Sequence, residues 1–177
     1  GKMGIDIYIA AKVMDLFLGS ISLAVFFMLA YEVIRDVIIA VLATAVFSLN
    51  AWFLRWTGTG METSLAVLLV LLTFWYCVRN EYVLATVFAI FLTLTRPESC
   101  ILIALIIFDL YINSHNKKRA INLGITLVLL FVVFLLPWFV YSTISFGKIV
   151  PNTAIAKAGL HFDFKDMFAT MWDAIST

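Results

Sequence analysis

Arg96-Pro97-Glu98 places a cation, a proline and an anion between two long apolar runs of the sequence. In a bilayer core a single charge costs roughly 2.5–3.5 kcal/mol on insertion scales, so such residues mark a candidate functional site. The planar guanidinium of arginine matches phosphate oxygens and stays charged where water is scarce. The structural alternative is that both side chains reach the membrane surface, or pair only to seal a helical hairpin.

Three more polar residues lie in loops that we expect near this pair. Glu62 follows two glycines in the loop 57–64, and Asn152 and Lys157 follow the last apolar run. Carboxylate and amide groups suit sugar hydroxyls, and lysine suits a phosphate. The alternatives are a solvated loop or helix-terminal acid at Glu62 and a turn cap at Asn152. The candidate substrate-binding residues are Glu62, Arg96, Glu98, Asn152 and Lys157.

The composition places these residues in a membrane protein. Hydrophobic residues make up 64% of the 177 and charged residues 13%, well outside the range of soluble domains. The net charge of +1 and its scattered basic residues give no phosphate-binding surface for nucleic acid. The lone histidines His115 and His161 give no metal-ligand spacing, so we expect neither a metal nor a cofactor. Asn50 and Asp109, inside apolar runs, are interpreted as structural, Asn50 by hydrogen bonding between helices.

The apolar runs predict an all-α, multi-pass transmembrane bundle of about six spans. Lys117-Lys118-Arg119 is the densest basic run, so we place it in the cytoplasm by the positive-inside rule. Counting from that anchor puts 57–64 and 96–98 on the non-cytoplasmic side and 79–81 in the cytoplasm. The predicted spans are 13–31, 37–56, 65–78, 82–95, 99–113 and 120–141.

The segment 82–113 has two interpretations. One kinked helix would be about 48 Å long, too long for a bilayer without severe tilt. We prefer a hairpin in which Pro97 starts the second arm, where its missing N–H costs little. Its arms would reach only about 21–23 Å, so Arg96 and Glu98 are expected at the floor of a recessed polar cavity that opens outward.

Two regions are expected along the chain. Residues 1–159 form the predicted transmembrane helical domain. From Leu160, apolar residues recur at helical spacing opposite polar ones such as Asp163 and Asp166. This pattern predicts a C-terminal amphipathic helix, 160–177, lying in the membrane interface.

Three loop motifs occur in a recognisable order and together resemble a known family. The chain is similar to GT-C-type, polyprenyl-phosphate-dependent membrane glycosyltransferases, in particular the mycobacterial terminal arabinofuranosyltransferase group, over roughly residues 10 to 158. Each motif alone is short, and the resemblance depends on their order and on their expected common face. The motifs are Gly60-Met61-Glu62-Thr63, Thr95-Arg96-Pro97-Glu98, and Phe146-Gly147 followed by Pro151-Asn152-Thr153.

The resemblance implies an inverting sugar transfer from a polyprenyl-phosphate donor to a glycan or lipid acceptor, outside the cytoplasm of a bacterial plasma membrane. It assigns Arg96 and Lys157 to phosphate, and Glu62, Glu98 and Asn152 to sugar hydroxyls or to holding those cations. The family's catalytic carboxylate lies in a first external loop, which Asp6 and Asp15 do not match. We therefore expect that carboxylate upstream of Gly1 and no activity from this chain alone. The alternatives are a transporter or flippase segment and a helical scaffold subunit.

Overall fold

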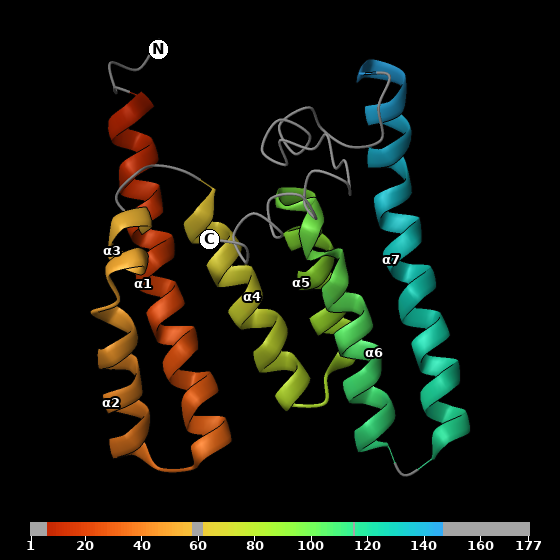
Figure 1. Ribbon diagram of the computed structural model, residues 1–177, viewed down its shortest axis with the longest axis horizontal. Coiled ribbons are helices and arrows are strands. Elements are labelled where there is room, and N and C mark those ends of the chain that lie inside the picture. The colour runs from red at the N-terminus through yellow and green to blue at the C-terminus, as the bar shows by residue number, and fades with distance from the viewer. Residues whose placement is uncertain (1–6, 58–61, 115, 147–177) are drawn as a thin grey trace, which may run out of the picture. The chain divides into compact units, whose positions relative to one another are not determined.

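The computed structural model describes residues 7–57, 62–114 and 116–146. Within these ranges the chain is all-helical, with seven α-helices, one 3₁₀ helix and no strand (Figure 1). The all-α class is therefore confirmed. The elements are α1 (Ile7–Ile34), α2 (Val37–Ser48), α3 (Ala51–Thr57), α4 (Thr63–Val78), α5 (Tyr82–Thr95), η1 (Pro97–Cys100), α6 (Ile101–Asn113) and α7 (Lys117–Phe146).

Two helices are long and apolar enough to cross a membrane. They are the segments Ile9–Ile34 of α1 and Lys117–Ile144 of α7, which contain the predicted spans 13–31 and 120–141. α2, α4 and α5 are apolar but shorter. Many large apolar side chains are exposed along α1, α2 and α7, among them Phe17, Ile38 and Phe134. Such continuous apolar surface is unfavourable in water and is typical of helices that face lipid.

The predicted span 37–56 is wrong as a single helix. α2 ends at Ser48, whose hydroxyl donates to the Ala45 carbonyl at 2.8 Å. Asn50 then caps α3, because its Oδ1 accepts the Phe53 N–H at 3.1 Å. Short polar side chains offer the backbone hydrogen bonds that compete with helix continuation, and here they break an otherwise apolar run.

The turn between α1 and α2 is shorter than the predicted 32–36. α1 continues to Ile34, Arg35 adopts a positive φ of 60°, and Asp36 begins the next helix. The Asp36 carboxylate accepts the N–H groups of Ile38 at 2.8 Å and Ile39 at 3.1 Å. This side-chain cap satisfies two N–H groups that lack intrahelical partners at the start of α2.

The described residues up to Leu135 form one compact unit, and α7 from Leu136 onward belongs to a second unit. Within the first unit α4 packs between α1 and α5, and α2 packs on the other side of α1 (Figure 1). Val25 of α1 is buried against Leu68 and Leu71 of α4. The first and fourth helices are thus neighbours although α2 and α3 separate them in the sequence.

The predicted hairpin at 82–113 is confirmed as a break between two helices. α5 ends at Thr95, as predicted, and Pro97 is the first residue of η1, which leads into α6. Tyr82 at the start of α5 and Leu110 near the end of α6 belong to one buried cluster, so the two helices are antiparallel. Ala85 and Ala89 are fully buried there, and their small side chains let the helices approach closely.

α7 is longer than predicted. It begins at Lys117, where the Asn116 Oδ1 accepts the Arg119 N–H at 3.2 Å, and it continues past Pro137 to Phe146. Phe131 and Leu135 pack against Ile90 of α5. The predicted interfacial helix 160–177 lies outside the described residues.

Candidate functional site at the Arg96 end

Arg96 lies where α5 stops. Its backbone is extended, with φ −139° and ψ 99°, and its N–H donates to the Leu92 carbonyl at 2.7 Å. Pro97 disfavours the helical conformation for the residue before it, and here the helix ends at that residue. The local sequence therefore places an arginine at the C-cap of α5, with an extended backbone.

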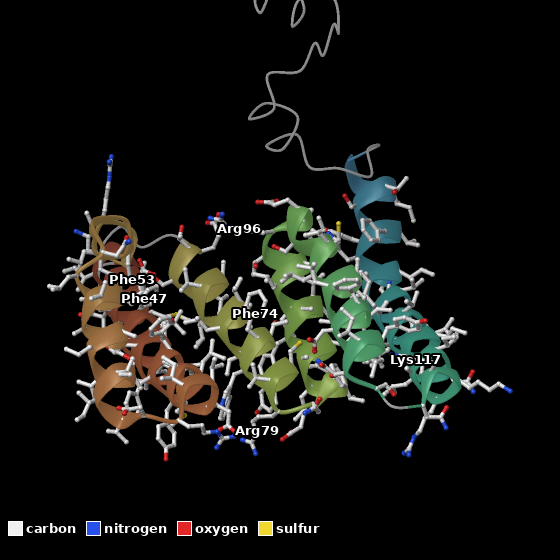
Figure 2. The ribbon with its side chains drawn as sticks, turned by 60° about the horizontal axis from the view of Figure 1, so that its bottom comes forward. Phe47, Phe53, Phe74, Arg79, Arg96 and Lys117 are labelled. Carbon is white, nitrogen blue, oxygen red and sulfur yellow. The ribbon has the colours of Figure 1, made fainter. Side chains whose placement is uncertain are left out.

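The Arg96 side chain reaches the start of α4. Its Nη2 lies 3.4 Å from the Thr63 Oγ1, to which it donates a long hydrogen bond across 33 positions of sequence. Figure 2 shows Arg96 at one end of α4 and Arg79 at the other. The contact brings the start of α4 and the 96–98 segment to the same end of the first unit, as the predicted topology requires.

A cavity of about 410 Å³ lies beside this contact. Phe47 of α2, Val67 and Val70 of α4 and Leu92 of α5 form apolar walls, and Arg96, Glu98, Thr63 and Ser99 supply its polar groups. The cavity is mainly apolar with charge at one side. It suits a ligand that has an apolar part and an anionic or hydroxyl-bearing part.

The guanidinium of Arg96 is incompletely satisfied. The residue is half-buried, and its Nε is buried without a hydrogen-bond partner in the described part of the chain. No described carboxylate lies within ion-pair distance of it, Glu98 included. An unsatisfied buried donor costs about 1–3 kcal/mol, and an anion would remove that cost. The alternative in which Arg96 and Glu98 pair to seal the hairpin has no ion pair to support it.

The other predicted site residues have different surroundings. Glu62 is exposed directly before α4, and its carbonyl accepts the Ala66 N–H at 3.0 Å. α4 begins after Glu62 without a side-chain cap, and the Thr63 hydroxyl accepts a hydrogen bond from Arg96. Asn152 and Lys157 lie outside the described residues. The structure thus brings together Arg96, Glu98 and Thr63, with Glu62 next to Thr63 in sequence.

A second polar group was not predicted as a site. Asp109, interpreted from sequence as structural, lines a separate cavity with Cys77, Asn80 and Asn113. The four-residue spacing of Asp109 and Asn113 places them on one helix face and was the available signal. Among the described residues, Asp109 and its neighbours included, no group of three His, Cys, Asp or Glu side chains could hold a metal ion.

No family model matches the chain, and neither a curated protein nor a solved structure matches it.

Proposed function

We propose that the cavity beside Arg96 binds the phosphate of a polyprenyl-phosphate sugar donor, and that the chain is part of a membrane glycosyltransferase. The observation that carries the proposal is the half-buried guanidinium with an unsatisfied Nε at the edge of an apolar cavity. A phosphate takes charge-assisted hydrogen bonds from this group, and the apolar walls accept the start of a lipid chain.

The reaction would transfer the sugar to a hydroxyl of a glycan or lipid acceptor. The positive charge of Arg96 would stabilise the phosphate as it leaves. Glu98, and Glu62 beside Thr63, would bind sugar hydroxyls, and Asn152 and Lys157 keep the roles implied by the family resemblance. Glu62 and Glu98 are assigned to sugar hydroxyls. The base that deprotonates the acceptor hydroxyl therefore has to be a different carboxylate.

The proposed topology has six spans and an outward-facing site in a bacterial plasma membrane. α6 runs from the Arg96 end to the loop before Lys117, so the basic run 117–119 lies at the opposite end of α6. Cysteines placed at 62 and 98 in a variant without Cys77 and Cys100 should react with an impermeant maleimide from outside intact cells. Labelling of the two positions from opposite sides would refute the shared outward cavity.

The binding step is tested with the purified chain in nanodiscs. We expect undecaprenyl phosphate to bind and undecaprenol, which lacks the phosphate, to bind at least tenfold more weakly. Arg96→Ala removes a charged hydrogen-bonding group worth about 1.5–3 kcal/mol, so affinity for the phosphate should fall about 10- to 100-fold. Arg79→Ala, which removes an arginine at the opposite end of α4, is the matched control and should leave it unchanged.

Two results would overturn the proposal. One is equal affinity for undecaprenol and undecaprenyl phosphate, which would show that the cavity recognises only the lipid chain. The other is wild-type phosphate affinity in Arg96→Ala. Circular dichroism and gel filtration of each variant check that a loss of binding does not come from loss of the fold.

A transporter or flippase segment is the second candidate, because cavities that contain charged residues lie at both ends of α4. The chain in proteoliposomes distinguishes the two. A flippase would move undecaprenyl phosphate between leaflets faster than empty vesicles do, whereas a donor-binding segment of a transferase would bind the lipid without moving it.

A further inference from the structure

The larger of the two cavities lies at the end of α4 away from Arg96. Its volume is about 670 Å³, and its walls come from α4, from α6 and from Asn80 in the turn after α4. Phe74, Leu102, Leu105 and Ile106 make most of the surface apolar. Figure 2 shows Phe74 midway along α4 and Arg79 at its far end. The apolar part of the cavity therefore lies toward the middle of the helices, and its polar residues lie toward the end marked by Arg79.

Hydrogen bonds organise the polar end. The Asn113 Nδ2 donates to the Asp109 Oδ1 at 2.9 Å, which fixes the carboxylate on the cavity wall. Buried Tyr82 donates its hydroxyl to the Asn80 Oδ1 at 3.0 Å. Asn80 has a positive φ of 60°, a conformation that asparagine tolerates better than most residues. Both Asp109 and Asn80 thus present fixed oxygen acceptors at the same cavity.

The charge of the cavity lining is negative. Asp109 is the only carboxylate among the cavity's described lining residues, and no described lysine or arginine lies within ion-pair distance of it. The nearby Arg79 pairs with Glu81 at 3.2 Å, and its guanidinium lies 5.2 Å from the centre of the Trp75 ring. A half-buried carboxylate without a cationic partner at the end of an apolar cavity favours a ligand that carries a positive charge.

We propose that this cavity binds an amphiphile with a primary ammonium headgroup. The ammonium donates hydrogen bonds to Asp109 and to the Asn80 oxygen, and the alkyl chain lies along Phe74, Leu102 and Ile106. Three donors on one ammonium match the fixed acceptors, whereas a phosphate or sulfate would meet the carboxylate with like charge. The ligand is an aminophospholipid of the bilayer or a soluble alkylamine. The site is separate from the Arg96 cavity and does not depend on the function proposed for it.

The two native cysteines make the test direct. Cys77 lines the cavity, and Cys100 is exposed in η1 at the other end of α6. The full chain in dodecyl maltoside is treated with N-ethylmaleimide at pH 7.5, and modification of each cysteine is followed by mass spectrometry. Dodecylamine should slow modification of Cys77 at least fivefold and leave Cys100 unchanged. Dodecanol and dodecyl sulfate, with the same chain length, should protect Cys77 less than twofold.

Asp109→Asn keeps the size of the side chain and removes its charge, and it should abolish the protection by dodecylamine. Circular dichroism and gel filtration check that the variant keeps its fold. Equal protection by dodecanol would overturn the proposal, because it would show that the cavity recognises only an apolar chain. Full protection in Asp109→Asn would also overturn it. If that variant is unstable, Asn80→Gly, which keeps the positive φ without strain, gives a second measure and should reduce the protection at least twofold.

Lipid binding in nanodiscs distinguishes an aminophospholipid from a soluble alkylamine as the ligand. Native mass spectrometry should detect phosphatidylethanolamine retained over phosphatidylcholine, whose trimethylammonium has no N–H, and Asp109→Asn should lose the preference. Retention of both lipids equally, together with protection by dodecylamine, assigns the site to a soluble amine. Absence of both effects refutes the site.

Discussion

The two ends of α4 carry cavities of opposite charge. At one end Arg96 presents a guanidinium with a buried, unsatisfied Nε to a cavity of about 410 Å³. At the other, Asp109 presents a carboxylate already fixed by Asn113 to a cavity of about 670 Å³. The same α4 face, through Val67, Val70 and Phe74, lines both.

The difference lies in how each charge is held. Arg96 follows a helix end that the sequence forces with Pro97, and its only described side-chain hydrogen bond, to Thr63, is long at 3.4 Å. Asp109 lies inside a regular helix, and its hydrogen bond comes from one turn along the same helix. The first charge depends on tertiary packing for its position, and the second is positioned within α6. Substitutions in the packing should therefore affect the Arg96 end more.

The largest effects are expected when a buried apolar side chain is shortened to alanine in each cavity wall in turn. Leu92 is 1% exposed beside Arg96 and Ile106 is 2% exposed beside Asp109. Leu92→Ala and Ile106→Ala should each lower the free energy of unfolding by about 2 kcal/mol, because the space left by the side chain stays partly unfilled. Unfolding in mixed dodecyl maltoside and dodecyl sulfate micelles measures this loss.

The two variants should then weaken ligand binding at different ends of α4. Leu92→Ala should weaken undecaprenyl phosphate binding about tenfold with little effect on Cys77 protection by dodecylamine. Ile106→Ala should reduce Cys77 protection by dodecylamine and have little effect on undecaprenyl phosphate binding. Its effect should be smaller than tenfold, because Asp109 keeps its bond to Asn113. Equal effects of either variant at both ends would mean that the cavities are not independent.

Arg96→Lys separates charge from shape at the Arg96 end. Lysine keeps the positive charge but loses the planar fork that can bind two phosphate oxygens at once. We expect phosphate affinity about fivefold below wild type and above that of Arg96→Ala, measured in the same nanodiscs. Affinity equal to that of Arg96→Ala would show that geometry, and not charge, dominates recognition.

Much of the helical framework could be predicted from local sequence. Arg96-Pro97 favours a helix end, and α5 ends at Thr95 as expected. The break at Leu49 and Asn50 was missed because the apolar pattern of 37–56 continues across it, and only a side-chain hydrogen bond reveals the stop. Apolar periodicity predicts that a helix exists more reliably than it predicts where a polar side chain ends one.

The site residues show the same limit. Arg96 and Glu98 were recognised because charges are rare between apolar runs. The contact of Arg96 with Thr63 joins positions 33 residues apart and depends on how α4 packs against α5, which no local pattern contains. Asp109 was assigned a structural role because one carboxylate near a helix end has an ordinary explanation. Its cavity exists only because α4 and α6 both border the same space.

Removing one hydroxyl at each end gives a smaller, matched effect. Thr63→Val removes the long bond to Arg96 and should lower phosphate affinity about twofold, since a 3.4 Å hydrogen bond is weak. Tyr82→Phe removes a 3.0 Å bond to Asn80 and should lower dodecylamine protection of Cys77 about threefold. If Thr63→Val has the larger effect, Thr63 contacts the ligand in addition to Arg96.

The smallest expected effect tests whether charges other than Asp109 near the second cavity influence amine binding. Glu81 pairs with Arg79 at 3.2 Å, and both side chains are about 40% exposed, so the pair is worth roughly 0–1 kcal/mol. Glu81→Gln should change the free energy of unfolding by less than about 1 kcal/mol and dodecylamine protection of Cys77 by less than twofold. It frees Arg79 from its partner. A large loss of protection would therefore mean that a freed Arg79 competes with the amine for Asp109, and that the Arg79–Glu81 pair keeps the second cavity negative.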